Sequence, residues 1–182
     1  LAVLNSSTAC FWLKQVSHDK GNGGYGGGIA DQEWERFFEF TGTKLQEFPL
    51  PSSLPVEFGR QLDALAHKLQ QLSPAAVCAE SAPTRARFDE ARKDYDSVRA
   101  RMIALQEELD WHTYGLYGLT DADLTYADAD LPGLELGQRA FEIALARKVT
   151  EGEESTAWFE RHGSTPITAL PPKWPAAYAS VV

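Results

Sequence analysis

The stretch that decides the fold reads FDEARKDYDSVRARMIALQEEL and spans residues 88–109. Its apolar positions recur at alternating spacings of three and four residues: Phe88, Ala91, Tyr95, Val98, Met102, Leu105 and Leu109. Such spacing lines one face of an α-helix with an apolar seam that packs against a neighbouring helix. The sequence therefore predicts a long helix of about 28 residues, roughly 40 Å at about 1.5 Å per residue.

A second seam precedes this helix. After Pro55 the apolar residues Phe58, Leu62, Leu65, Leu69 and Leu72 repeat the same spacing, and a linker rich in alanine, serine and proline follows at 74–83. Two seams joined by about ten residues predict an antiparallel helical hairpin. Because the first arm is shorter, the apolar residues at the far end of the second arm need another surface, either from the remaining helices or from a partner.

The rest of the chain predicts a mainly α fold with a small α+β N-terminal piece and a C-terminal helical bundle. We divide the chain into 1–53, the hairpin at 54–113 and a helical region at 114–182. Further helices are expected at 4–16, 136–149 and 155–162, a short helical turn followed by one or two strands at 34–48, a short helix opened by a capping box at 120–123, and an extended segment at 166–175 with a terminal turn. Gly115 and Gly118 are expected to interrupt the long helix.

Composition limits the function classes. The 182 residues are 43% hydrophobic and 24% charged, as in folded soluble proteins, and no apolar run is long enough for a membrane span. The two cysteines cannot form a disulfide framework, so we expect a cytoplasmic protein. The net charge of −9 disfavours a free-standing nucleic-acid binder, so any DNA contact must be local. With Leu1 first and Met102 the only methionine, we expect an excerpt of a longer polypeptide.

A glycine-rich stretch at 21–28 holds six of the fourteen glycines and predicts a mobile loop. It formally contains the dinucleotide pattern G-x-G-x-x-G at Gly21, Gly23 and Gly26, but a helix-like segment precedes it and further glycines follow, which disfavours an independent nucleotide-binding enzyme. Basic residues around it favour contact with a phosphate backbone or a base instead. A connection without a role is about equally consistent with the sequence.

Other candidate sites have weaker support. Asp121, Asp123, Asp128 and Asp130 suggest calcium, but Pro132 and Arg139 stand at ligand positions of the only loop that fits. The four histidines lack metal-ligand spacing, and Ser164 lacks a nucleophile elbow. We therefore assign no catalytic, cofactor-binding or metal-binding residue.

Several long stretches carry a family resemblance. Glu108-Leu109-Asp110, Tyr114 and the run 116–120, LYGLT, look like the motif that closes many large restriction-type adenine-specific DNA methyltransferases. Residues 4–16 resemble a helix of their TaqI-like specificity domain, and residues 40–51 its closing strand. With 137–148 and 156–167, the chain is most similar to the C-terminal part of the methyltransferases of BREX phage-defence systems.

The resemblance implies a parent enzyme that transfers a methyl group from S-adenosylmethionine to adenine in double-stranded DNA, with the base flipped out of the duplex. This chain lacks the Asn-Pro-Pro-Tyr or Asp-Pro-Pro-Tyr catalytic motif and a strand-preceded cofactor motif. The implied role is therefore target recognition and assembly without catalysis, with DNA and possibly other defence proteins as partners and no membrane.

The residues that we predict for DNA contact flank the glycine-rich stretch and the segment after it: Lys14, His18, Lys20, Tyr25 and Lys44. The alternative is an acidic helical module that docks the methyltransferase to partner proteins without touching DNA. Charge favours that alternative for the C-terminal part, because residues 114–182 hold five basic and ten acidic residues. Residues 1–60 hold five and seven, so a DNA face belongs to the first third.

Overall fold

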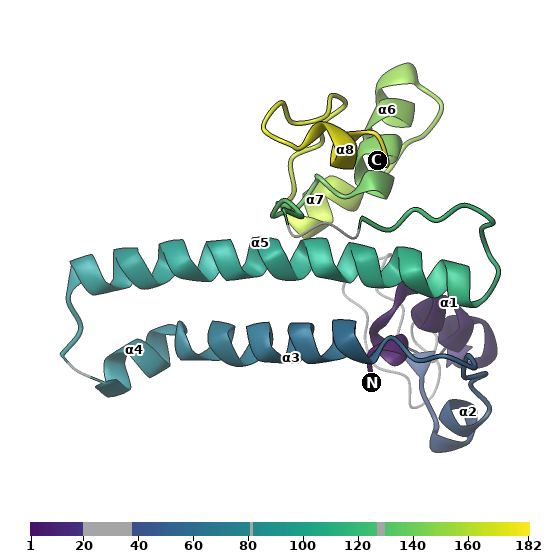
Figure 1. Ribbon diagram of the computed structural model, residues 1–182, viewed down its shortest axis with the longest axis horizontal. Helices are drawn as coiled ribbons and strands as arrows, with labels where there is room; N and C mark the ends of the chain where they lie inside the picture. The colour runs from purple at the N-terminus through teal and green to yellow at the C-terminus, as the bar shows by residue number, and fades with distance from the viewer. Residues whose placement is uncertain (20–37, 81, 127–129) are drawn as a thin grey trace.

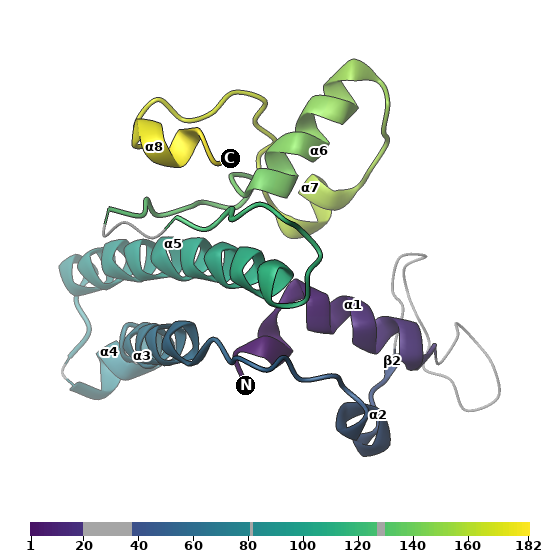
Figure 2. The ribbon, with the colours of Figure 1, turned by 45° about the vertical axis from the view of Figure 1, so that its right-hand side comes forward.

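The computed structural model describes residues 1–19, 38–80, 82–126 and 130–182. One long helix, α5, runs through the middle of the molecule, with α3 and α4 antiparallel on one side of it and the helices of the C-terminal layer on the other (Figure 1). The view in Figure 2 shows the same three-layer order, with the N-terminal segment at the C-terminal end of α5. The predicted mainly α fold is confirmed.

The element bounds follow this order along the chain. The N-terminal segment contains the 3-10 helix η1 (Val3–Asn5), α1 (Ser7–Val16), β1 (His18–Asp19), β2 (Phe38–Glu39) and α2 (Gly42–Gln46). The hairpin contains α3 (Val56–Gln71), α4 (Pro74–Glu80) and α5 (Arg85–Leu116). The C-terminal layer contains α6 (Ala140–Glu151), α7 (Trp158–His162) and α8 (Ala176–Ala179).

The hairpin agrees with its two apolar seams, with two differences. The linker at 74–83 was expected to be irregular, but Ser73 accepts a hydrogen bond from Ala76 N at 3.3 Å and the chain forms α4. Gly115 does not interrupt α5, which continues to Leu116. Thr84 begins α5 by accepting a hydrogen bond from Arg87 N at 3.3 Å.

The far end of the α5 seam is covered by the C-terminal layer. Leu105 and Leu109 are buried, and Leu105 belongs to a core cluster with Leu131, Leu134, Ile143, Trp174 and Tyr178. Of the two surfaces considered from the sequence, the chain's own C-terminal residues supply the cover. Hydrophobic burial therefore holds this layer on the face of α5 that α3 leaves open.

The N-terminal segment forms a smaller core of its own, in which Val3, Ala9 and Phe48 are buried. Trp12 packs edge-on against Phe48, with ring centroids 5.4 Å apart. The predicted strand at 40–51 is wrong: β2 ends at Glu39 and residues 42–46 form α2. The reason is Thr41, whose hydroxyl accepts a hydrogen bond from Lys44 N at 3.3 Å and so begins a helix.

The C-terminal layer follows the expected order of segments. Helices α6 and α7 both end at a glycine in the left-handed region, Gly152 and Gly163. Residues 166–175 form no helix or strand before α8, but they are not extended throughout, because the backbone bends at 168–169 and turns at 172–173. The helix expected at 120–123 is absent from this described segment. Thr120 instead accepts a hydrogen bond from Ala122 N at 3.2 Å, which forms a turn rather than a helical start.

Gly137 is a position that only glycine can occupy. Its φ is +94°, and a Cβ there would lie 2.2 Å from the carbonyl oxygen of Thr165. Gly137→Ala should therefore lower the free energy of unfolding by about 2 kcal/mol or more, because it combines backbone strain with a clash against main chain. Equilibrium denaturation measures the loss.

Gly115→Ala is the matched control, because Gly115 is helical and its Cβ would meet no atom within 4 Å. Helix propensity predicts a gain of about 0.5–1 kcal/mol there. Equal changes in the free energy of unfolding for the two substitutions would contradict the close approach of Gly137 to Thr165.

Candidate functional site

The structure places three of the five residues predicted for DNA contact in the N-terminal segment. Lys14 is in the last turn of α1, His18 begins β1, and Lys44 is in α2, and these elements lie together at one end of the molecule (Figure 1). The main chain joins two of them, because His18 pairs with Glu39 in the antiparallel contact between β1 and β2. Lys20 and Tyr25 lie outside the described residues, as does the glycine-rich stretch.

The two lysines have different surroundings. The ammonium group of Lys14 lies 5.9 Å from the centre of the Phe38 ring, a cation–π contact that holds the side chain beside β2. The ammonium group of Lys44 lies 2.7 Å from a carboxylate oxygen of Glu47. A phosphate group would therefore have to compete with Glu47 for Lys44.

Among the described residues, no three or more histidine, cysteine or acidic side chains are grouped so that they could hold a metal ion. No described helix is both long and apolar enough to cross a membrane. Cys10 and Cys78 are exposed and free.

A second constellation, which the sequence analysis did not single out as a site, lies on the C-terminal half of α5. We call Glu107, Glu108 and Asp110 the acidic junction. Each carboxylate accepts a hydrogen bond from the backbone N–H of a different segment: Glu107 from Ala140 at 2.6 Å, Glu108 from Tyr126 at 2.6 Å and Asp110 from Ser7 at 2.7 Å. Three segments distant in sequence therefore attach to one stretch of a single helix.

Two of these backbone donors belong to the first turns of helices. Ser7 begins α1 and Ala140 begins α6, and the first N–H groups of a helix have no partner within it. A carboxylate there satisfies the donor and also interacts favourably with the positive end of the helix dipole. Two carboxylates of the acidic junction, both on α5, thus cap the N-termini of α1 and α6.

Burial dominates the ionisation of this junction. Desolvation raises the pKa of Glu107 and Asp110, and it raises the pKa of Glu108 to about 7 despite the hydrogen bond from Tyr126, with the neighbouring Glu107 charge adding to the rise. The phenol of Tyr178 donates to Glu107 at 3.2 Å, and burial together with this carboxylate raises the pKa of Tyr178. Glu108 therefore changes charge near neutral pH.

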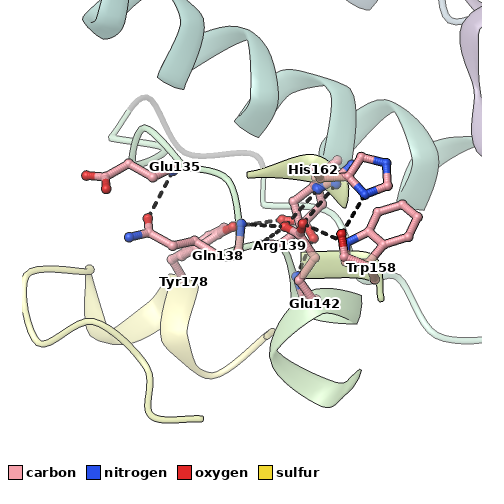
Figure 3. A network of polar contacts seen from close by, with 10 residues as sticks. Glu135, Gln138, Arg139, Glu142, Trp158, His162 and Tyr178 are labelled. Atoms are coloured by element: carbon pink, nitrogen blue, oxygen red, sulfur yellow. Dashed lines mark hydrogen bonds and ion pairs between the residues drawn. The ribbon is translucent and has the colours of Figure 1, made fainter. Parts of the chain in front are cut away.

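The start of α6 is organised by a further carboxylate, Glu142, which is completely buried. It accepts hydrogen bonds from Gly137 N at 2.9 Å, from Arg139 Nε at 3.0 Å and Nη2 at 3.1 Å, and from Trp158 Nε1 at 3.1 Å. Figure 3 shows these side chains converging, with His162 stacked on Trp158 at 3.8 Å between ring centres. Burial alone would raise the pKa of Glu142, but the hydrogen bonds from Arg139 and Trp158 hold it below the usual value.

These buried acids were missed because composition counts charges without locating them. The charge count for residues 114–182 does not include Glu107 and Glu108 and does not locate Glu142, whereas all three are buried and hydrogen-bonded. One signal was available: Glu108 and Asp110 flank Leu109 in the seam that the sequence showed to need a further cover. Acids beside an apolar seam that must be covered are candidates for buried caps.

Comparisons with known proteins place the chain. It is 53% identical over 189 aligned residues to the "Adenine-specific methyltransferase PglX" of Streptomyces coelicolor, and the match covers 100% of the chain. The chain matches the C-terminal region of PglX over its whole length. It spans 16% of the length of that PglX, in its C-terminal region.

A family model described as "Domain of unknown function (DUF7008)" matches residues 102–182. This range begins within α5 and includes the acidic junction and the whole C-terminal layer, whereas Lys14, His18 and Lys44 lie only within the region similar to PglX. No solved structure matches the chain.

The pKa of Glu108 predicts how stability depends on pH. Because its folded-state value, about 7, lies above the ordinary value of 4.5, its contribution to stability is fully present below about pH 4.5 and is lost as pH rises through 7. Glu108→Gln keeps an acceptor for Tyr126 N–H but cannot ionise, so it should be more stable than the unsubstituted protein at pH 8 by about 1–3 kcal/mol and nearly equal at pH 4.5.

Denaturant unfolding of both proteins at pH 4.5, 6 and 8 measures this difference. Glu90→Gln, at an exposed position of the same helix, is the control and should not alter the pH profile. A constant difference between Glu108→Gln and the unsubstituted protein across these pH values would contradict the raised pKa.

Proposed function

We propose that this chain is the non-catalytic target-recognition and assembly segment of an S-adenosylmethionine-dependent, adenine-specific DNA methyltransferase of a BREX-type phage-defence system. The observation that carries the proposal is the 53% identity to PglX over the whole chain. The absence of a catalytic Asn-Pro-Pro-Tyr or Asp-Pro-Pro-Tyr motif from the sequence supports a role other than methyl transfer itself. The parent chain would supply the cofactor and catalytic residues and work in the cytoplasm.

The N-terminal segment is the part that we assign to DNA. Lys14 and Lys44 lie on α1 and α2, which contact each other, and His18 lies on β1, which pairs with β2 beside Lys14. A phosphate backbone passing this end of the molecule would therefore meet more than one of them. Lys20 and Tyr25 belong to the same proposal on sequence grounds. Contacts of this kind position the enzyme on DNA and are read out as salt dependence.

A second candidate function applies to the C-terminal layer, which we propose as a docking surface for other defence proteins. Its net acidity repels DNA, and apolar side chains are exposed on or beside it: Phe141 is 45% and Leu119 63% exposed. The two functions concern different segments and are compatible.

Labelled methyl transfer tests the main proposal. The parent methyltransferase and a version lacking this segment are incubated with S-adenosylmethionine and duplex DNA, with the other defence proteins present. The parent should methylate at a defined sequence, and the shortened protein should bind the cofactor but lose sequence-selective methylation. A parent that never methylates adenine, or a shortened protein with unchanged selectivity, would contradict the proposal.

Lys14→Ala in the parent should weaken binding to all DNA sequences several-fold and reduce the slope of log affinity against log salt by about 1, because one phosphate contact is lost. Glu47→Gln should have the opposite effect, because it releases Lys44 from its ion pair. Lys68→Ala, on an exposed position of α3, is the control and should leave affinity and slope unchanged. Equal losses of DNA affinity for Lys14→Ala and Lys68→Ala would contradict the assignment of the DNA surface to the N-terminal segment.

A further inference from the structure

A large apolar groove lies between the start of the chain and α3. It has a volume of about 840 Å³ and runs between residues 1–5, residues 50–56 and the first half of α3, with Met102 and Gln106 of α5 at its base. Three apolar side chains around it are strongly exposed: Leu50 at 68%, Leu54 at 53% and Val56 at 52%. A hollow lined by exposed apolar side chains can take up apolar side chains of another segment.

Helix α3 has one covered face and one open face. Phe58, Leu62 and Leu65 are half-buried and pack against the core cluster that contains Leu105 of α5. Val56 and Ala66, which line the groove, are exposed. The face of α3 toward α5 is therefore covered, whereas the face toward the groove is open.

Specific contacts hold the walls of the groove in place. At Gly59 a Cβ would lie 3.2 Å from the Cβ of Ala2, so α3 and the start of the chain are in close contact. The side chain of Gln106 donates to the carbonyl oxygen of Asn5 at 3.0 Å and fixes residues 1–5 against α5. The walls are thus held in place while the space between them stays open to an occupant.

The chemistry of the lining selects an apolar occupant. The charged lining residues are one arginine and one aspartate, Arg60 and Asp63, whose formal charges cancel. Such a surface offers nothing to a phosphate backbone, and it does not select an acidic or a basic peptide. Apolar side chains of a polypeptide fit it best.

We infer that this groove binds, within the same polypeptide, the stretch of the parent methyltransferase that immediately precedes the position of Leu1. This inference rests on the parent chain of the proposed function. The present chain spans 16% of PglX, so in such a parent most of the polypeptide lies outside the residues described here. The match lies in the C-terminal region of PglX, so in such a parent further polypeptide is joined to residues 1–5, which form one wall of the groove, and binds as an intramolecular ligand of high effective concentration.

Site-specific photo-cross-linking in the full parent chain tests the inference. A benzoylphenylalanine is placed at Leu54 or at Ala66, both of which line the groove and are exposed, so the probe does not disturb the core. Gln61 is the matched control, because it is exposed on the same helix but does not line the groove. Cross-linked peptides are identified by mass spectrometry, with isotope-mixed protein to separate links within one chain from links between copies.

The expected result is a link within one chain from Leu54 and Ala66 to the stretch preceding Leu1, at several-fold higher yield than from Gln61. Links between two copies, links to another protein or to a remote part of the same chain, or yields equal to the control would overturn the inference. If a probe at Ala66 lowers the melting temperature, Val56 takes its place, because it also lines the groove and is 52% exposed.

The experiment is done without DNA or cofactor, and methyl transfer is measured separately on the same protein. A parent that shows the expected links but no methylation contradicts the proposed function and leaves the groove assignment intact. Normal sequence-selective methylation with links to another partner overturns only the groove assignment.

Discussion

The structure depends on carboxylates that accept hydrogen bonds away from bulk water. Glu107, Glu108 and Asp110 accept hydrogen bonds from the backbone N–H groups of Ala140, Tyr126 and Ser7, and Glu142 accepts from five donor atoms at the start of α6. Taking a carboxylate out of water is costly, and among these acids the hydrogen bonds outweigh that cost for Glu142, whereas desolvation raises the pKa of Glu107, Glu108 and Asp110. These hydrogen bonds determine how each segment is placed. The hydrophobic contacts around Leu105 are not directional, whereas the hydrogen bonds fix which residue of each segment contacts α5.

The sequence was sufficient for the hairpin and insufficient for its attachments. Alternating spacings of three and four residues determine a helical face, so α3 and α5 could be predicted, together with the need for a cover over Leu105 and Leu109. A capping threonine outweighed the strand expectation at Thr41, and a local turn outweighed the helix expectation at Thr120. The buried acids could not be located because their ionisation depends on the donors that folding brings to them, and those donors come from segments 18 to 103 residues away.

For the candidate site, the sequence identified residue types and the structure supplied their surroundings. Charge counting directed attention to the first third of the chain, and Lys14, His18 and Lys44 do lie in one N-terminal segment. What spacing could not show is that Lys44 already has a carboxylate partner while Lys14 lies against an aromatic ring. The relation to PglX rests on long runs of similar residues. From their physical properties alone, these runs indicate only packed corners and helices.

The span of the acidic junction in sequence also bears on how the molecule assembles. Hairpin contacts between α3 and α5 join neighbouring segments and require only a short loop to close, whereas the hydrogen bond from Ser7 to Asp110 spans 103 residues and that from Tyr178 to Glu107 spans 71. Local contacts form faster than distant ones, because long loops lose more entropy on closure. We therefore expect the hairpin to form first and both ends of the chain to pack onto it afterwards. A nascent chain would hold its central helices well before either flank is in place.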